Sequence, residues 1–468
     1  MMVFTLLLIL AGCGVAFFNW RWGVVAAIVV GMAQDPLRKV IPGTPAFLAM
    51  GSIPVWMATL AAAAYRRQLS VRDFFSTFPR LALWIRVFAL YLVIPATNSV
   101  TWGAGTWKIT LLGLFVYTAS FLALVAGWRY PVRRGDAWRL LGFYAVITAV
   151  FLAGGPLDSW GWSERYPFIG TTTMGHLWLT HRTQAAVFML AGFFRSPDIM
   201  GWHAALVFMV AVIMAFRARG AARAAWIALA VWGLLNVWLC GRRKMLAMLP
   251  VFLGCYVFLI SRFKSVRRLV AGVGTVLLIA GLGWYFIMAL EQDQAVERFY
   301  LTTLTEAGGR VQEHGYRSIF STVSQAGFWG YGLGMSQQGI HNIEAEKPRV
   351  WQESGPPKLV AELGVPGAIL FLIMGGVLIA TAYQVVRLVR RDEDFYILAG
   401  MLSVLAANMA SGIVSAQIFG DPLVALLLSF LIGLLLSGVR TPSRPGAGRQ
   451  EAAALPPEVE MVRPPRLR

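Results

Sequence analysis

A long polar stretch, residues 316–371, carries the side chains best suited to chemistry in this chain. Loops of this length in compact proteins are usually functional. Glu353 is the loop acid next to the apolar segment that follows, whereas Glu362 belongs to the start of the next helix, where the macrodipole favours an acid. A carboxylate at a membrane boundary is suited to act as a general base toward a hydroxyl. The structural alternative is a salt bridge from Glu353 to Arg349 or Lys358.

The same loop supplies basic residues and a glycine-rich turn at residues 330–334. Arg310 and Arg317 precede the turn, and their separation places both on one face of a helix. Backbone N–H groups of such a turn can point toward an anion. His341 and Lys358 are secondary candidates for the site. A lone histidine in a loop is usually just solvated. The loop is therefore predicted to bind an anion beside its catalytic base.

Two clusters of cations interrupt otherwise apolar sequence. Arg242, Arg243 and Lys244 lie between two apolar runs without an acid beside them, and Arg38 with Lys39 follows Asp35. A cation near membrane depth costs about 2.5–3.5 kcal/mol on insertion scales and tends to be functional. Guanidinium groups match phosphate oxygens in pairs, and lysine adds a point charge. The clusters therefore predict a site for a lipid-linked pyrophosphate. Snorkelling anchors, or pairing with nearby carboxylates such as Asp35, are the alternatives.

The elements that must position these residues are membrane helices. Hydrophobic residues make up 58% of the chain and charged residues 13%, with a mean hydropathy of +0.65, whereas soluble domains average about 25% charged residues. The sequence predicts an all-α, polytopic membrane protein with about 12 or 13 helices long enough to cross a bilayer. The apolar runs are residues 2–18, 23–34, 45–64, 81–96, 106–127, 138–154, 200–216, 224–240, 245–260, 269–289, 364–384, 395–412 and 423–439.

The net charge of +19 reflects membrane topology and does not indicate nucleic-acid binding. Basic residues gather in short loops that alternate with loops poor in Lys and Arg, which is the positive-inside pattern. The pattern places in the cytoplasm the loops at residues 65–80, 129–139, 217–223, 262–268 and 387–391. The two cation clusters then face outward, together with the loops at 97–105, 155–199, 290–360 and 413–422.

Four parts of the chain follow from this pattern. We expect N-terminal transmembrane helices in residues 1–289, a large periplasmic loop with the candidate active site in 290–360, C-terminal transmembrane helices in 361–440 and a disordered cytoplasmic tail in 441–468. The three cysteines fall in or at the ends of apolar runs, with no spacing suited to a metal or a disulfide. No metal or other cofactor is predicted.

Four segments resemble the bacterial O-antigen polymerase and O-antigen ligase family of polytopic glycan-joining enzymes. They are DPLRKVIPG, GFFRSPDIMGWHA, NVWLCGRRKMLAML, and RSIFSTVSQAGFWGYGLG running on to ESGPPKLVAELGVPG. The resemblance implies a helical enzyme of the bacterial inner membrane with its active site on the periplasmic face. It implies a glycan donor on undecaprenyl pyrophosphate and a glycan acceptor, with membrane lipid and other polysaccharide-assembly proteins as partners.

The last segment departs from the ligases at the position of the base. Ligases carry His-Asn, nine residues and then Gly-x-x-Gly, whereas Glu353-Ser354 stands at that distance from Gly364 here. His341-Asn342 has the ligase residues at the wrong spacing. The resemblance therefore implies Glu353 as the catalytic base, with His341 as a secondary candidate.

The resemblance also implies how the donor is held. Pyrophosphate contacts are expected from Arg242, Arg243 and Lys244, helped by Arg317, Arg310 and Arg38. Because the ligase histidine is missing, we predict a metal-independent glycosyltransferase that polymerises exopolysaccharide or O-antigen repeat units. The alternatives are a ligase-type transferase onto a lipid or protein acceptor and, in another class, a lipid-linked glycan flippase. A flippase would need charges along a central path, whereas these charges gather at one face.

Overall fold

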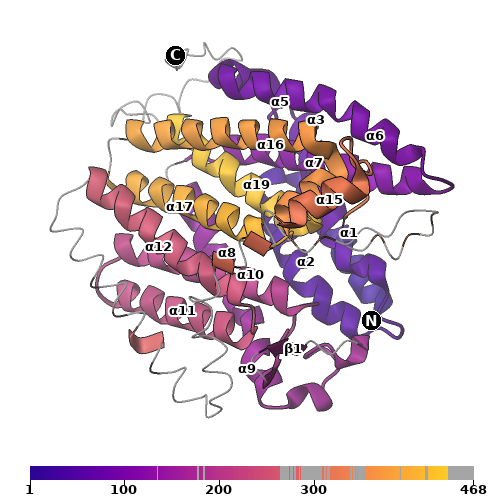
Figure 1. The fold of residues 1–468 in the computed structure, drawn as a ribbon. Helices are drawn as coiled ribbons and strands as arrows, with labels where there is room; N and C mark the ends of the chain where they lie inside the picture. Colours follow the sequence, from indigo (N-terminus) through magenta and orange to yellow (C-terminus); the bar gives the residue numbers. More distant parts are fainter. Residues whose placement is uncertain are drawn as a thin grey trace.

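The chain folds into a bundle of long helices that lie side by side (Figure 1). The computed structural model describes residues 1–133, 135–175, 179–182, 185–263, 274, 278, 281–283, 285, 308–309, 312–313, 317–337, 340, 343, 345, 352, 354–389, 392–416 and 420–440. Within these residues the structure is helical apart from loops and one short antiparallel hairpin, in which Leu179 of β1 lies opposite Phe188 of β2.

The elements follow one another from the N-terminus in two groups. The first group is α1 (Met2–Phe18), α2 (Trp20–Val40), η1 (Ala46–Met50), α3 (Ser52–Tyr65), α4 (Val71–Thr77), α5 (Pro79–Tyr91), α6 (Val93–Val100), α7 (Thr106–Arg129), α8 (Asp136–Leu152), α9 (Gly154–Ser159), η2 (Trp162–Glu164), η3 (Thr172–Met174), β1 (Leu179–Arg182) and β2 (Ala185–Phe188). The second group is α10 (Pro197–Arg217), α11 (Gly220–Leu239), α12 (Arg243–Phe263), α15 (Ser318–Ala326), α16 (Gly355–Leu388), α17 (Asp392–Val414), α19 (Pro422–Leu436) and η6 (Ser437–Arg440).

Ten helical segments of the described chain are long and apolar enough to cross a membrane. They coincide with ten of the predicted apolar runs and confirm a multi-pass, all-helical membrane protein. The spans are Ala46–Tyr65, Pro79–Val100, Thr106–Arg129, Asp136–Ser159, Pro197–Arg217, Gly220–Leu239, Arg243–Phe263, Gly355–Leu388, Glu393–Val414 and Pro422–Arg440. The two earliest runs form α1, which is apolar but shorter, and part of α2. The run at 269–289 lies almost wholly outside the described residues.

Side-chain contacts group the loops into two ends of the bundle. Arg129 pairs with Asp73 at 2.9 Å, and Arg217 reaches Glu393 at 3.5 Å. The first pair joins two of the loops that the positive-inside pattern assigns to the cytoplasm, and the second joins such a loop to the start of α17, directly after the loop at 387–391. We call this the arginine end. The grouping agrees with the predicted alternation of loops, and the orientation of the bundle in the membrane stays a prediction.

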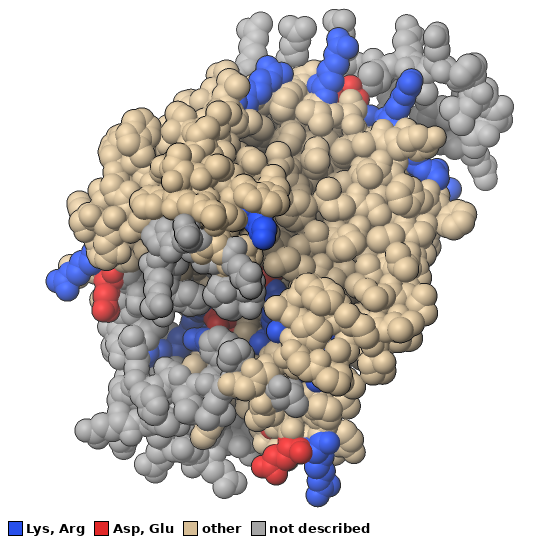
Figure 2. Space-filling model, turned by 90° about the vertical axis from the view of Figure 1, so that its right-hand side faces the viewer, with Lys and Arg blue, Asp and Glu red and all other residues tan. Residues whose placement is uncertain are grey.

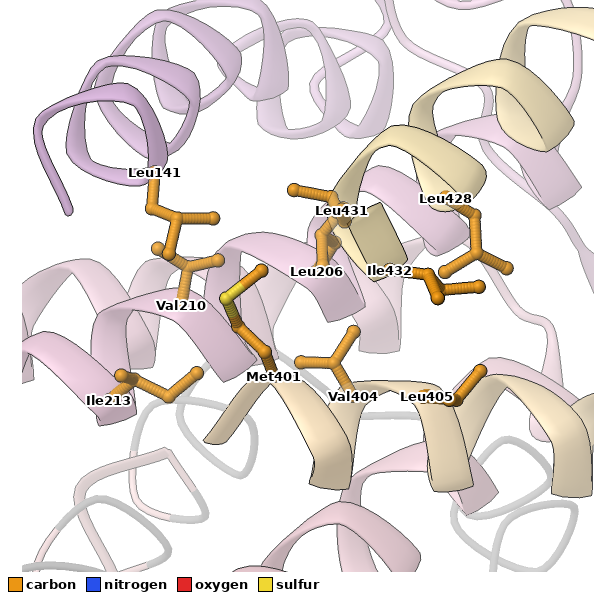
Figure 3. Close-up of a pocket in the computed structure, with 10 residues that line it drawn as sticks. All are labelled: Leu141, Leu206, Val210, Ile213, Met401, Val404, Leu405, Leu428, Leu431 and Ile432. Carbon is orange, nitrogen blue, oxygen red and sulfur yellow. The ribbon is translucent and has the colours of Figure 1, made fainter. Parts of the chain in front are cut away.

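A seam between four central helices is closely packed by apolar side chains. In the most apolar part of α10, 94% of the residues are buried inside the protein. The corresponding share for the span Asp136–Ser159, which contains α8, is 44%. Side chains of α8, α10, α17 and α19 enclose a void of about 10 Å³ (Figure 3), which is only about the space that one water molecule occupies. They are Leu141, Leu206, Val210, Ile213, Met401, Val404, Leu405, Leu428, Leu431 and Ile432. In the described bundle, this seam between the four helices therefore offers no polar path.

Two glycines allow α7 and α19 to cross in backbone contact. A Cβ on Gly127 would overlap the carbonyl oxygen of Phe430, and a Cβ on Gly433 would overlap that of Leu124. Small residues permit such close approach in membrane bundles, where van der Waals packing between helices is a main source of stability. The crossing fixes the position of α19 and so of Asp421, the residue that precedes it.

Candidate functional site

The ends of four helices bring charged side chains together at the end of the bundle opposite the arginine end. α2 finishes there, and α10, α12 and α19 begin there. Figure 2 views the molecule from the right-hand side of Figure 1 and shows Lys, Arg, Asp and Glu side chains inside a hollow. We call the following set the charge cluster: Asp35, Arg38, Lys39, Arg195, Asp198, Arg242, Arg243, Lys244 and Asp421.

Arg195 joins two buried carboxylates within the charge cluster. Its Nη1 lies 3.4 Å from Oδ2 of Asp35, and its Nη2 pairs with Asp421. Both carboxylate side chains are only 2% exposed, so the pairing is shielded from water. Asp421 also caps α19, because its Oδ1 accepts the N–H groups of Leu423 and Val424 at 3.0 and 3.1 Å. Arg195 therefore connects the end of α2 to the start of α19.

Sequence reasoning assigned no role to Arg195. The residue stands in GFFRSPDIMGWHA, one of the segments that carry the family resemblance. A cation directly before the helix-start signal Ser-Pro-Asp was the available clue. Its partners Asp35 and Asp421 are far from it in the sequence, so no local pattern could have indicated them.

Asp198 supplies a carboxylate to the second basic group. Ser196 caps α10 by accepting the N–H of Ile199 at 3.3 Å, which places Asp198 in the first turn. Arg242 Nη2 lies 2.8 Å and Lys244 Nζ lies 2.7 Å from its two carboxylate oxygens. The lack of an acid beside these cations in the sequence had favoured an anion site. The fold corrects that argument, because it brings the acid from α10.

Lys39 is held by backbone oxygens of the segment before α10. Its Nζ donates to the carbonyl oxygens of Gly192 and Phe194 at 2.8 and 2.6 Å, and the residue is 3% exposed. Asp35, which the sequence offered as a partner for this lysine, pairs with Arg195 instead. Lys39 therefore anchors the segment that carries Arg195 and keeps its positive charge within the charge cluster.

Arg38 is the cation of the charge cluster with the most donors left for a ligand. Its Nε donates to the carbonyl oxygen of Thr44 at 3.1 Å. Its two terminal guanidinium nitrogens have no protein acceptor among the residues that the structure describes, and its side chain is partly exposed. A guanidinium group can bind a phosphate or carboxylate through two parallel hydrogen bonds.

The charge cluster carries more cations than carboxylates. Among the described residues its six cations face three carboxylates, and the nearby Asp158, which accepts the N–H groups of Ala191 and Gly192 at 3.2 and 3.1 Å, adds a fourth negative charge. Arg243 is only 5% exposed, so part of the positive excess is shielded from water. An excess of partly buried positive charge favours an anion, because the potential near low-dielectric walls is focused and weakly screened.

The glycine-rich turn packs against helices. The N–H of Tyr331 donates to the carbonyl oxygen of Ala361 at 2.7 Å, and the N–H of Leu333 donates to that of Pro95 at 2.8 Å. Gly334 has a φ of +81°, and a Cβ there would overlap the backbone of α7. Two of the N–H groups that the sequence analysis offered to an anion are therefore used within the protein, and the turn seats the loop against α6, α7 and α16.

Lys358 and Glu362 form a fully buried pair one turn apart on α16. Lys358 Nζ lies 2.5 Å from Glu362 Oε1 and also donates to the carbonyl oxygen of Ser336 at 2.9 Å. The carboxylate accepts the N–H of Ser336 at 3.2 Å, Gln337 Nε2 at 3.4 Å and the hydroxyl of Tyr117 at 3.1 Å. Lys358, a secondary candidate for the substrate site, therefore holds the loop onto α16, as Glu362 does.

The Lys358–Glu362 pair yields a stability prediction. Removing one member of a buried ion pair typically costs about 3–5 kcal/mol, because the other charge stays buried without its partner. We therefore expect Lys358→Met to lower the thermal unfolding temperature of the purified protein in detergent markedly. The double variant Lys358→Met/Glu362→Leu leaves no lone charge and should regain most of the loss. A single variant that melts like the parent would contradict this assignment.

α16 begins earlier than the apolar run indicates. Its first residue is Gly355, and the helix is kinked at Gly364, which has a φ of +70°. The N–H of Val365, freed at the kink, donates to the carbonyl oxygen of Phe328 at 2.9 Å. The first turns of α16 thus extend beyond the predicted membrane entry. Ser354, its N-cap residue, is 1% exposed and directly follows Glu353.

The remaining predicted site residues lie elsewhere. Glu353, Arg310 and His341 are outside the described residues. Arg317 is exposed at the start of α15, and within the described chain no hydrogen bond or ion pair joins it to the charge cluster. Of the predicted pyrophosphate ligands, the fold therefore groups at one end Arg38, Arg242, Arg243 and Lys244.

The comparisons with known proteins add no identity to this picture. No protein-family model matches the chain, and no curated protein matches it. No group of three or more His, Cys, Asp and Glu is placed to hold a metal ion in the described parts of the structure. The class of protein defined by the fold is a multi-pass helical membrane protein with a buried, cation-rich cluster at one end of the bundle.

Proposed function

We propose that this protein is a polysaccharide polymerase of the O-antigen polymerase and ligase type, acting at the periplasmic face of the bacterial inner membrane. The observation that carries the proposal is the charge cluster, where cations outnumber carboxylates among the described residues, at the end of the bundle opposite the basic loops. A donor linked through pyrophosphate to a membrane lipid brings several phosphate oxygens to this depth. The resemblance of four segments supplies the reaction class.

The transfer would use the charge cluster to hold the leaving group. Arg38 offers two terminal nitrogens, and the pair formed by Arg242 and Lys244 adds positive charge that Asp198 only partly balances. Charge-assisted contacts of this kind stabilise the negative charge that develops on the leaving pyrophosphate. Arg195 positions Arg38 indirectly, because it fixes Asp35 in the preceding turn of α2.

Glu353 is the proposed base. Its carboxylate takes the proton from an acceptor sugar hydroxyl, and the hydroxyl oxygen forms a bond to the anomeric carbon of the donor. The bond from that carbon to the phosphate oxygen breaks, and undecaprenyl pyrophosphate leaves with the electron pair. Cationic side chains neutralise the leaving group. A carboxylate in place of the ligases' histidine favours a polymerase over a ligase.

The closely packed apolar seam between four of the described helices favours an enzyme over a flippase. A carrier of charged, lipid-linked glycan needs polar groups along a path between its helices. The void between α8, α10, α17 and α19 is lined by apolar side chains alone and is about the size of one water molecule (Figure 3). The charged residues gather instead at the two ends of the bundle.

Sizing the lipid-linked glycans of a deletion strain tests the proposed function. Loss of a polymerase should leave single repeat units on the lipid carrier, because assembly and export continue without joining. Long glycan chains that are not transferred to their final acceptor would favour the ligase alternative. Repeat units that stay on the cytoplasmic side would favour the flippase. A glycan profile identical to that of the parent strain would contradict the proposed function.

A further inference from the structure

A cavity of about 420 Å³ lies at the arginine end, away from the charge cluster. It is lined by the start of α2, the loop after α3, the segment from the end of α7 to the start of α8, the start of α17, and η6. One acid, Asp394, and five arginines line it within the described structure: Arg21, Arg67, Arg129, Arg133 and Arg440. Sites for small molecules typically enclose about 300–1,000 Å³, so the cavity has a suitable size for one.

Backbone oxygens hold two of these arginines in place. Arg21 Nε donates to the carbonyl oxygen of Tyr130 at 2.9 Å, and Arg440 Nη1 donates to that of Trp128 at 2.9 Å. These acceptors lie at the C-terminal end of α7, where unsatisfied carbonyl groups favour cations. Burial and the nearby Asp136 raise the pKa of the Tyr130 phenol to about 12, so this side chain adds no negative charge.

Nearby carboxylates leave part of the positive charge unbalanced. Asp73 pairs with Arg129 at 2.9 Å. Asp136 is occupied by backbone, since its Oδ2 accepts the N–H of Arg133 at 2.8 Å. With Asp394, three acids stand against the five arginines of the lining. The cavity therefore keeps an excess of guanidinium groups, and these groups match phosphate oxygens in pairs.

Arg67 lines the cavity in a strained backbone conformation. Its φ is +54°, in the left-handed region, and its N–H donates to the carbonyl oxygen of Ala64 at 2.9 Å as α3 ends. This position after a helix is commonly glycine, because side chains are disfavoured there. Strained residues concentrate at ligand sites. The end of α3 thus fixes the position of Arg67, whose side chain adds a guanidinium group to the lining.

The cavity also has an apolar side. Val132, Trp138, Ile397 and Leu398 line it together with the arginines. A lining that is cationic on one side and apolar on the other suits a ligand with a phosphate on a carbon skeleton. Basic pockets between membrane helices bind the headgroups of anionic lipids in this manner.

We propose that this cavity is a binding site for a phosphate-bearing ligand, with the arginines on its phosphate oxygens and the apolar residues against its carbon skeleton. An anionic phospholipid brings this chemistry from within the membrane, and a soluble phosphorylated molecule brings it from the water. The site is separate from the charge cluster, and the proposal does not depend on the glycan-joining reaction.

Lipid and phosphate titrations of the purified full-length protein test the proposal. Binding is measured by native mass spectrometry in detergent with phosphatidylglycerol, with phosphatidylcholine as the neutral lipid, and with inorganic phosphate as the soluble probe. The variants are Arg67→Gly and Arg133→Gln. Arg219→Gln is the matched control, because Arg219 is exposed just before α11 and does not line the cavity. Each cavity variant should weaken phosphatidylglycerol binding about five-fold, the change that corresponds to about 1 kcal/mol for each basic residue.

Arg67→Gly separates a ligand role from a structural role. Glycine relieves the left-handed strain, so the unliganded variant should melt at or above the temperature of the parent while its ligand binding falls. Inorganic phosphate binding that is lost in the cavity variants, without selective binding of phosphatidylglycerol, would support the site and identify a soluble source. Equal losses in Arg219→Gln, or no dependence of either ligand on Arg67 and Arg133, would overturn the proposal.

Discussion

Glu353→Gln is expected to reduce glycan joining by about 10²–10⁴-fold, the usual contribution of a general base. The amide keeps the shape of the side chain and cannot accept the proton of the acceptor hydroxyl. Donor binding should survive, because the pyrophosphate contacts come from other residues. Polymer length in cells and transfer by purified protein, normalised to the amount of inserted protein, measure the effect. Ser354, which directly follows Glu353 in the sequence, is the buried N-cap residue of α16.

His341→Ala is the necessary control for Glu353. Its spacing from Gly364 differs from the family pattern, so we expect only a modest loss. A structural salt bridge of Glu353 would show itself differently, as lost expression or lower thermal stability that is partly restored by removing the cationic partner. Near-normal polymer from Glu353→Gln together with an inactive His341→Ala would transfer the role of base to the histidine.

Arg38→Gln and Arg242→Gln are each expected to lower kcat/KM for the lipid-linked donor by about 30-fold or more. A charge-assisted contact that loses one buried partner costs about 2–5 kcal/mol, and each 1.4 kcal/mol is about a factor of ten. Arg38 is the cleaner test, because its one protein hydrogen bond in the described chain is to the backbone of Thr44. The thermal stability of the Arg38→Gln variant should therefore differ little from that of the parent protein. Arg243→Gln completes the series as the most buried guanidinium of the set.

Arg195→Gln tests the structural role of the cation that joins two carboxylates in the charge cluster. This residue bridges Asp35 and Asp421, so its loss leaves two buried carboxylates without their cation. We expect a fall in thermal stability, with partial recovery in the triple variant that also carries Asp35→Asn and Asp421→Asn. If Arg38→Gln and Arg242→Gln instead destabilise the protein and leave the transfer rate per folded molecule unchanged, the cations are structural and the pyrophosphate site is elsewhere.

The apolar runs of the sequence determine most of the fold. Ten of them form helices able to cross a membrane, because a span of this length must satisfy its backbone hydrogen bonds within itself. The alternation of basic and non-basic loops likewise predicts which loops share one end of the bundle, and the contacts Arg129–Asp73 and Arg217–Glu393 agree with that grouping. Both signals are local and depend on composition, so a single sequence is enough to read them.

The partners of the charged residues could not be predicted in this way. Asp35 was expected to form an ion pair with Arg38 or Lys39, but in the structure it pairs with Arg195. The sequence predicted Lys358 as a salt-bridge partner of Glu353 or as a substrate-site residue. In the structure it pairs with Glu362. For Lys358, side-chain direction on α16 selects Glu362 one turn away. For Asp35, the partner comes from a segment 160 residues away, so only the packing of the chain brings the two together.

The sequence by itself therefore determined that this is a multi-pass helical membrane protein and which short segments carry its unusual cations. Only the tertiary structure decided that Asp198 joins Arg242 and Lys244, that Arg195 ties α2 to α19, and that five arginines enclose a cavity at the other end. The reason is physical. Helix formation depends on neighbours along the chain, whereas an ion pair depends on how helices pack, and that packing is set by contacts such as those of Gly127 and Gly433.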